Sequence, residues 1–332
     1  MKRVLRASMW VALLTCLGCR DESDVRVIRL AHALDQGHSV HVAMEHMAEL
    51  VSEQSGGRLR IQIYPSEQLG SERETLELVQ IGSVGMAKVS AAALEQFSAA
   101  YRVFGVPYLF RDRNHQLAVL DGDVGKEILR SGRDEFLLGL AYYDSGSRNF
   151  YTKTRVERPS DLEGLKIRVM NSRTAISMVD GLGAAATPLA LGELYTALQQ
   201  GVVDGAENNL PSFHLLRHYE VCKYYVLDAH TAVPDVVVIG ASLYASLSSQ
   251  EKQWLSHAVD ASMVYQRQLW ATSERESLAA IQKAGVTVVE PDLEAFQRVG
   301  ERLQSAFRSD AALASLMDRV RAVNPVAQVL QP

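Results

Sequence analysis

Residues 249–284 contain neither Gly nor Pro over thirty-six residues, and Gly285 follows them. Ser249 is a suitable N-cap residue, and Glu251 places an acidic side chain in the first turn. A single helix of this length would extend about 54 Å, at roughly 1.5 Å per residue. That length exceeds the width of one small lobe, so the segment either bridges two lobes or breaks into two helices. We expect the bridge.

Elsewhere the chain alternates strand-like and helix-like runs, a pattern typical of α/β architecture with largely parallel sheets. The predicted strands are 25–31, 59–64, 85–89, 138–143, 147–152, 202–203 and 236–239. The predicted helices before the long segment are 40–54, 71–81, 174–181 and 191–200. No internal repeat or low-complexity tract interrupts this pattern.

The N-terminus has the composition of an export signal. Three basic residues precede the short apolar run 7–17, which is too short to span a bilayer, and Gly18-Cys19 follows. We predict a signal peptide over 1–18 and a lipid on Cys19, which would tether a periplasmic protein to a membrane; ordinary secretion is the alternative. Removal of the signal peptide changes the net charge from −5 to −8. That acidity argues against nucleic acid as a partner.

The mature chain carries few groups that are suited to covalent or metal chemistry. Cys222 would be its only unmodified cysteine, which excludes an internal disulfide and is typical of a buried, inert thiol. The nine histidines show no convincing metal-ligand spacing, and no hydrolase or phosphate-loop motif is present. We therefore predict a protein that is not an enzyme and holds no cofactor.

Arg168 follows the strand-like residues Lys166 and Ile167, and Asn208 follows forty residues later. A guanidinium group is a planar, two-pronged donor that suits a carboxylate, and an amide both donates and accepts hydrogen bonds. The pair suggests a pocket for a small organic acid. A structural salt bridge and a turn asparagine are the alternative.

Several segments, in this order and spacing, resemble the DctP-type substrate-binding proteins of tripartite ATP-independent periplasmic (TRAP) transporters. They are Tyr-Pro-Ser-Glu-Gln-Leu-Gly-Ser-Glu-Arg-Glu at 64–74, 106–110, Arg148, 162–169, 187–188, 193–201 and 203–208. The resemblance covers nearly the whole mature chain. It implies a periplasmic-binding-protein fold in which two α/β lobes, joined by a hinge, close on the ligand, with a long helix spanning both lobes.

The same resemblance implies the lobe boundaries and the partners. Lobe I would comprise 22–145 plus 234–273, and lobe II 146–233 plus 274–332. The protein would be a monomer that delivers its ligand to the small and large membrane subunits of a TRAP permease. Transport energy would then come from an ion gradient that acts on the membrane partner.

Within this family, the residue matching Arg168 binds the ligand carboxylate, and those matching Arg148 and Asn208 assist it. The residues themselves suggest further ligand contacts. Asn209 is an adjacent amide that could instead cap the following helix. His32 ends the first predicted strand, where ligands gather in open α/β sheets, whereas His38 and His41 are expected at the surface.

Three more candidates come from lobe I and the predicted hinge. Lys88 lies in the otherwise apolar run 84–94, where a lysine needs a partner. Ser90, two residues on, would face the same side of the strand, and Asp235 lies near the predicted hinge crossing. Glu72 and Glu74 are assigned to the first turn of their helix.

The local sequences at 31–32, 38–41, 86–90 and 207–213 resemble those of family members that bind hexuronates such as D-glucuronate and D-galacturonate. Leu210 departs from the proline that often follows the asparagines. The sequence thus predicts an extracytoplasmic binder of a sugar acid. One alternative is a C4-dicarboxylate or other organic-acid binder that uses Arg168 and Arg148 separately. The other is a sensory module that presents its ligand to a receptor kinase.

Overall fold

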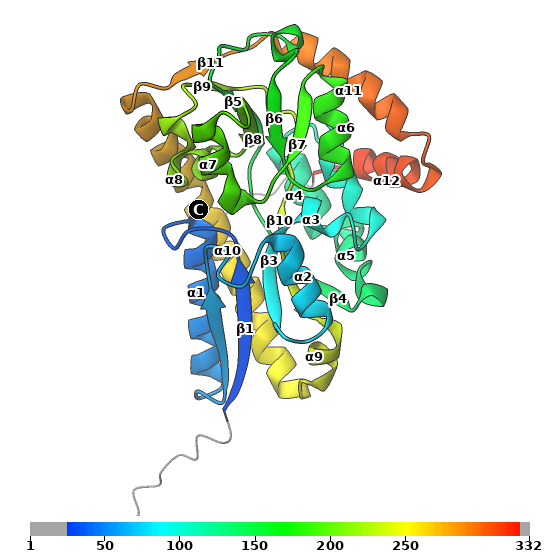
Figure 1. Cartoon of the computed structure of the whole chain (residues 1–332). Helices are drawn as coiled ribbons and strands as arrows, with labels where there is room; N and C mark the ends of the chain where they lie inside the picture. The colour runs from blue at the N-terminus through cyan, green and yellow to red at the C-terminus, as the bar shows by residue number, and fades with distance from the viewer. Residues whose placement is uncertain (1–24, 326–332) are drawn as a thin grey trace, which may run out of the picture.

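The computed structural model describes residues 25–325, which form two lobes built on two separate β-sheets (Figure 1). The predicted signal peptide and Cys19 lie outside these residues. The first sheet has the spatial order β2 (Leu59–Tyr64), β1 (Arg26–His32), β3 (Met86–Ser90), β10 (Asp235–Gly240), β4 (Leu137–Tyr143). The second has the order β11 (Thr287–Val289), β9 (Tyr224–Val226), β5 (Asn149–Thr152), β8 (Gly205–Asn208), β6 (Lys166–Val169), β7 (Ala185–Pro188).

Helices cover both sheets. Those that follow first-sheet strands are α1 (Ser39–Gln54), α2 (Glu72–Gln80), α3 (Ala91–Leu94), α4 (Arg113–Asp121), α5 (Asp123–Arg130) and α9 (Ala241–Ser246). Those that follow second-sheet strands are α6 (Arg173–Gly181), α7 (Leu191–Gln200), α8 (Leu210–Leu215), α11 (Leu293–Phe307) and α12 (Ala311–Ala322). Within residues 25–325, short 3-10 helices also occur at Ala99–Gly105, Arg133–Glu135, Pro159–Leu162 and His218–Glu220.

Both sheets are mixed rather than largely parallel, because the chain passes twice between the lobes as an extended strand. The first crossing, residues 144–148, joins β4 to β5, and the second, residues 227–234, joins β9 to β10. Each crossing strand enters its new sheet antiparallel to its neighbours: β10 to β3 and β4, and β5 to β8 and β9. The crossings lie side by side, since the Arg148 N–H donates to the Thr231 carbonyl at 2.8 Å.

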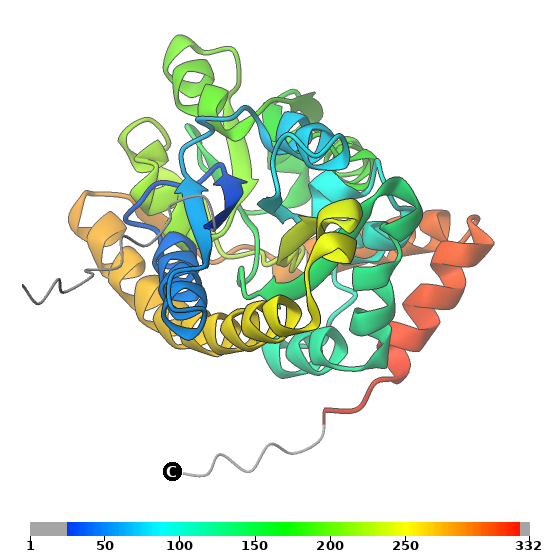
Figure 2. The same cartoon turned by 90° about the horizontal axis from the view of Figure 1, so that it is seen from below.

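The long helix α10 (Ser249–Lys283) is unbroken and, as predicted, spans both lobes, which makes it the third connection between them. Its first part packs on α1 and β4, and its last part packs on α8 of the other lobe (Figures 1 and 2). Gly146 in the first crossing adopts a φ of 58°, and a Cβ there would lie 2.6 Å from Glu274 Oε1 on α10. The helix therefore packs directly against the crossing strand. Its N-cap is Ser248, one residue before the predicted Ser249.

The first sheet is buried on both faces. Along β10, Val236 and Val238 face one apolar cluster, whereas Val237 and Ile239 face the other, which includes Met44 of α1. A strand that is buried on both sides typically has a continuous run of apolar, β-branched residues in its sequence. Each such side chain contributes about 1.5–3 kcal/mol relative to an exposed one. β10 is therefore fixed firmly where it leaves the hinge.

The C-terminal helix α12 differs from the predicted lobe boundary. Leu313, Leu316 and Met317 pack into the apolar cluster of the first lobe, together with Phe104. The sequence placed everything from residue 274 onward in lobe II. The chain instead returns to the first lobe after α11, because the apolar stripe of α12 packs into the core of that lobe.

Most predicted strands and helices are confirmed to within a residue or two. One strand is wrong: residues 202–203 form a turn after Gly201, and the strand is β8, residues 205–208. The expected surface position of His38 and His41 is also wrong, since both side chains are buried. His38 caps α1 and its ring lies 5.9 Å from that of Trp270, because α1 packs along α10.

Candidate functional site

A cavity lies between the lobes, beyond the carboxyl ends of β1, β2 and β3, where open α/β sheets bind ligands. Its volume is about 150 Å³, which is room for on the order of ten water molecules and so for one small metabolite. Polar side chains from both lobes line it. They are Glu67, Ser71, Glu72, Arg73, Lys88, Ser90, Gln96, Ser145, Arg148, Arg168, Asn171, Asn208, Asn209, Ser212 and Asp235.

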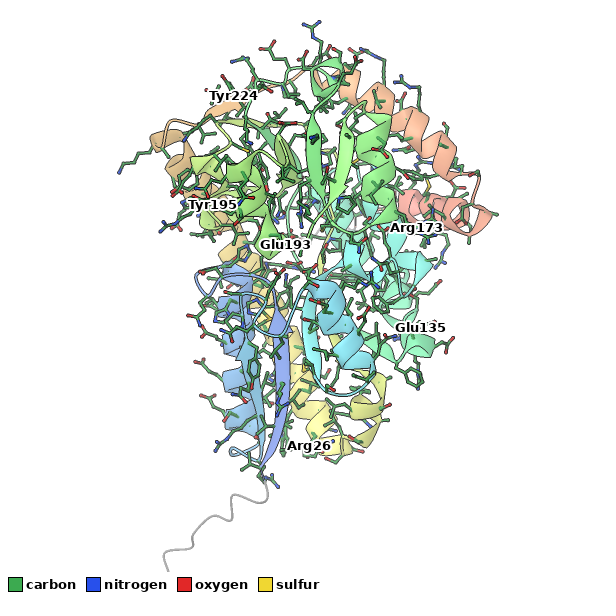
Figure 3. All side chains as sticks on the ribbon, viewed as in Figure 1. Arg26, Glu135, Arg173, Glu193, Tyr195 and Tyr224 are labelled. Carbon is green, nitrogen blue, oxygen red and sulfur yellow. The ribbon has the colours of Figure 1, made fainter. Side chains whose placement is uncertain are left out.

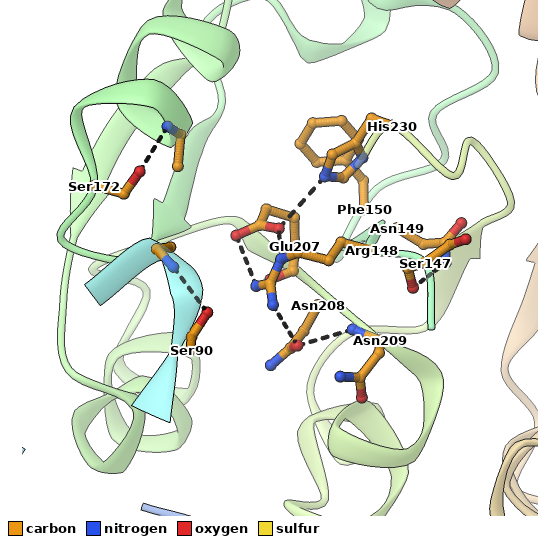
Figure 4. Close-up of polar contacts among 12 residues, drawn as sticks. Ser90, Ser147, Arg148, Asn149, Phe150, Ser172, Glu207, Asn208, Asn209 and His230 are labelled. Atoms are coloured by element: carbon orange, nitrogen blue, oxygen red, sulfur yellow. Dashed lines mark hydrogen bonds and ion pairs between the residues drawn. The ribbon is translucent and has the colours of Figure 1, made fainter. Parts of the chain in front are cut away.

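Arg148 belongs to a closed network of buried polar groups (Figure 4). Its Nε and Nη2 donate to the two carboxylate oxygens of Glu207, and Nη1 donates to Asn208 Oδ1 at 2.9 Å. On the other side of Glu207, His230 lies 3.4 Å from Oε2 and binds Asp228 Oδ2 at 2.7 Å. Two cations thus face two carboxylates, so the network is neutral as a whole.

These contacts set the protonation of the network. Burial alone would raise the pKa of Glu207, but Arg148 and His230 hold it down at about 2. Burial would likewise lower the pKa of His230, but Asp228 and Glu207 raise it to about 9. Both groups are therefore charged at neutral pH. Arg148 reaches Asn208 with its remaining donor and fixes the orientation of that amide.

Arg168 lies two strands away, in β6, and its surroundings are different. Nε and Nη2 both donate to the Leu189 carbonyl, at 2.9 and 2.8 Å. Nη1 is buried and makes no hydrogen bond to any residue from 25 to 325. Burial lowers the pKa of Arg168, with only distant help from Tyr151 and Glu207. The structure thus holds one guanidinium nitrogen in the cavity wall without an anion beside it.

The first-lobe side of the cavity carries a third cation, which is outnumbered by carboxylates. Lys88 Nζ lies 3.1 Å from Asp235 Oδ1 and 3.7 Å from Glu72 Oε1. Antiparallel pairing of β3 with β10 brings Lys88 and Asp235 together, and α2 presents Glu72 from its first turn. Burial raises the pKa of Glu72 despite the nearby lysine. This end of the cavity is acidic and rich in hydrogen-bond acceptors.

The structure brings seven of the eight predicted ligand residues to the cavity. They are Arg168, Arg148, Asn208, Asn209, Lys88, Ser90 and Asp235. His32 is not in the cavity wall: its Nε2 bonds to His41 Nδ1 at 2.9 Å and its Nδ1 accepts the Leu34 N–H at 3.1 Å. Burial, followed by the charge of Lys88, lowers its pKa to about 2. The ring is therefore neutral and packed behind the site.

Two predicted residues have structural partners of their own in the cavity wall. Asn209 Oδ1 accepts the Ser212 N–H at 2.9 Å and caps α8, while its Nδ2 donates to Ser145 Oγ at 3.1 Å. Ser90 Oγ accepts the Ala92 N–H at 3.3 Å and caps α3.

The sequence patterns did not point to Glu67, Gln96 or Ser145 as residues of the cavity wall, and they assigned Glu72 only to its helix. A signal existed for Glu67, because it comes shortly after β2, as the cavity residue Leu34 comes shortly after β1. Parallel strands end at the same edge of a sheet, so both positions lie near the ligand side. Gln96 and Ser145 lie in loops that no local pattern distinguishes.

Within 25–325, no group of three or more His, Cys, Asp or Glu side chains is arranged to hold a metal ion. Over the same range, no helix is long and apolar enough to cross a membrane. Cys222 is buried, and this burial raises the pKa of its thiol to about 12.

Comparison with known proteins agrees with this geometry. The family model described as bacterial extracellular solute-binding protein, family 7 (DctP), matches residues 30–310. A TRAP periplasmic solute-binding protein of Xanthobacter autotrophicus, solved with β-D-galacturonate, is 37% identical with a TM-score of 0.87; the match covers 90% of this chain and all of the other. One of Anaerococcus prevotii, solved with D-glucuronate, is 35% identical with a TM-score of 0.88, over 90% and 98% of the two chains.

Among curated relatives, the Salmonella typhimurium protein YiiZ is 35% identical over 94% of this chain and 95% of its own length. The two solved relatives thus share the fold over nearly the whole of the chain. The chain belongs to the DctP family, the extracytoplasmic solute-binding proteins of TRAP transporters.

Proposed function

We propose that this protein captures a hexuronate, such as D-glucuronate or D-galacturonate, and delivers it to a membrane permease without covalent chemistry. The observation that carries the proposal is the buried Nη1 of Arg168, which has no partner among residues 25–325. A buried cation is costly unless an anion accompanies it. A ligand carboxylate would supply that anion and accept a short, charge-assisted hydrogen bond.

The charges elsewhere in the cavity support a monocarboxylate over a dicarboxylate. Lys88 already faces Asp235 and Glu72, so a second ligand carboxylate there would meet repulsion from both. Sugar hydroxyls, which donate as well as accept, suit such a set of acceptors. A ligand with one charged end and several hydroxyls therefore fits better than succinate or malate.

Arg148 supports the same choice. Glu207 and Asn208 occupy its guanidinium donors, so it is not a free cation for a second carboxylate. The dicarboxylate alternative requires such a cation. Asn208 Oδ1 accepts from Arg148 and from the Asn209 N–H at 2.8 Å, which leaves the Nδ2 amino group for a ligand. We propose that Arg148 acts through Asn208, by holding its amide.

The ligands of the two solved relatives support this proposal, since both are hexuronates. Delivery to two TRAP membrane subunits remains part of the proposal. So does tethering of the mature protein by a lipid on Cys19, which lies outside the described residues. Mass measurement of the mature N-terminal peptide would test the tether: a diacylglyceryl modification on Cys19 is expected, and an unmodified cysteine would contradict it.

A thermal-shift and calorimetry series would test the ligand. D-glucuronate and D-galacturonate should raise the melting temperature, because a ligand at 100 times its Kd stabilises by about 2.7 kcal/mol. D-glucose, which lacks only the carboxylate, should not. Succinate and malate should also fail. A shift with succinate and none with either hexuronate would refute the proposal and favour the dicarboxylate alternative.

A further inference from the structure

Helix α7 begins at the cavity without a cap of its own. Its N-cap residue is Ala190, which has no side-chain oxygen. Glu193 turns back to accept the Ala190 N–H at 3.2 Å, within the same lobe. Figure 3 shows Glu193 at the end of α7 that faces the first lobe. The first N–H groups of α7 therefore need an acceptor from elsewhere.

Glu67 of the first lobe supplies that acceptor. Its Oε2 accepts the Gly192 N–H at 3.2 Å. The partners come from different lobes, since Glu67 follows β2 and Gly192 lies in the first turn of α7. Gly192 is necessary for the approach: a Cβ there would lie 2.4 Å from Glu67 Oε2.

The backbone that carries Glu67 adopts an uncommon conformation. Ser66 and Glu67 have φ angles of 54° and 57°, so two consecutive residues other than glycine are left-handed. Their N–H groups are held by the Leu34 carbonyl at 3.0 Å and the His32 carbonyl at 3.1 Å. Such conformations persist only where surrounding bonds fix them, and they concentrate at ligand clamps. Here the turn places the carboxylate across the cleft.

The second lobe connects the same helix end to the ligand-binding arginine. Both Nε and Nη2 of Arg168 donate to the Leu189 carbonyl, three residues before Gly192. The segment 189–192 is thus held by Arg168 within its own lobe and by Glu67 from the opposite lobe. Any closure that brings Glu67 to α7 also closes the cavity around Arg168.

We propose that Glu67 is an interlobe latch: its carboxyl group caps α7 only when the lobes are closed, and so slows ligand release. The inference rests on the proposed function in assuming that the lobes close on a ligand. An N–H acceptor oxygen is present whether or not the carboxyl group is protonated. Glu67→Gln should therefore keep most of the latch, whereas Glu67→Ala should lose it.

A double-mutant cycle tests the latch with D-glucuronate in stopped-flow experiments. Glu67→Ala should raise the dissociation rate about fivefold, the effect of losing one helix cap, with the association rate changed less than twofold. Gly192→Ala should do the same, because its methyl group takes the place of Oε2, although alanine favours the helix itself. Gly192→Ala should add nothing to Glu67→Ala. Additive effects would mean that Glu67 only contacts the ligand, and would overturn the latch.

Glu193→Ala is the matched control, since it removes a carboxylate from the same helix end without removing a contact between lobes. It should change the dissociation rate less than twofold. The comparison of dissociation rates also separates the latch from the identity of the ligand. It is made with whichever acid of the thermal-shift series binds the wild-type protein, even if D-glucuronate proves not to be the ligand. Equal dissociation rates of wild type and Glu67→Ala for that acid would overturn the latch.

Discussion

Arg148 and Arg168 lie in the wall of one cavity and are similarly buried, yet their electrostatic surroundings are opposite. Arg148 directly precedes β5, and Arg168 lies in β6 of the same sheet. Arg148 faces Glu207, and the pKa of its guanidinium is raised even though burial acts against it. Arg168 faces a carbonyl group, and burial lowers its pKa. One charge is balanced within the protein, and the other is not.

The difference separates what holds the lobe together from what recognises a ligand. A balanced network gains nothing from an incoming anion, because each of its donors already has an acceptor. An unbalanced cation carries a desolvation cost that a ligand carboxylate can relieve. The affinity for ligand should therefore depend on Arg168, whereas the stability of the fold should depend on the Arg148 network.

The largest effect should come from Glu207→Ala. It leaves Arg148 and His230 buried without their shared carboxylate. Breaking a buried ion pair costs about 3–5 kcal/mol, so the free energy of unfolding should fall by about that amount. Urea titration of ligand-free protein would measure it. A loss below about 1 kcal/mol would show that water compensates the two cations, and would remove the contrast with Arg168.

Arg168→Met should have the converse effect. The ligand-free protein should lose only about 1–2 kcal/mol, because Leu189 loses two hydrogen-bond donors but no ion pair is broken within residues 25–325. Affinity for D-glucuronate should fall by about 3 kcal/mol, a factor on the order of 10². Calorimetry and urea titration of the same preparation would measure both. Unchanged affinity in a folded Arg168→Met variant would refute the role of this arginine.

The pH dependence of stability sharpens the comparison, because His230 belongs only to the balanced network. Its folded pKa of about 9 lies above the usual 6.5. The stabilisation is therefore full below pH 6.5 and is lost as the pH rises through 9, by about 3 kcal/mol. Urea titrations across that range would measure the loss. In the His230→Gln variant, the free energy of unfolding should not change over the same pH range. A decrease like that of the wild type would mean that another group causes the effect.

Below pH 4.5 the network should lose stability again, this time through protonation of Glu207. The folded pKa of Glu207 is about 2, below the usual 4.5, so its stabilisation is present above pH 4.5 and is lost as the pH falls toward 2. The combined contribution of Glu207 and His230 to stability should thus be greatest between about pH 4.5 and 6.5. Above pH 6.5, ligand binding through Arg168 should not follow this profile, since its guanidinium group and the ligand carboxylate both stay charged there. Toward pH 2 the ligand carboxylate itself becomes protonated, so binding should weaken in that range for a separate reason.

Sequence patterns were sufficient to predict the elements that depend on residues close together in the chain. The long helix was visible from the absence of Gly and Pro, and β10 from its run of branched apolar residues. Arg168 stood out because a charged residue interrupts a buried strand. The mixed strand directions were not predictable in this way, because they depend on which sheet β10 and β5 join after crossing between lobes.

The missed features depend on contacts between distant segments. Glu207 is the partner of Arg148, 59 residues away, and nothing local distinguishes it from a surface carboxylate. Glu67 meets Gly192 only across the cleft. The placement of α12 on the first lobe likewise depends on which core its apolar stripe meets. Local patterns identified residues that need a partner, but not which partner they have.

The smallest effect should come from Asn209, whose two side-chain groups both have partners in the protein. Its Oδ1 caps α8 through the Ser212 N–H, and its Nδ2 donates to Ser145 Oγ. Asn209→Ala should cost about 1 kcal/mol of unfolding free energy, as N-cap losses do, and Asn209→Asp should recover the cap. Affinity for D-glucuronate, measured by calorimetry, should change less than threefold in the alanine variant. A larger loss would place Asn209 with Arg168 among the groups that the ligand contacts, and its capping role would then be secondary.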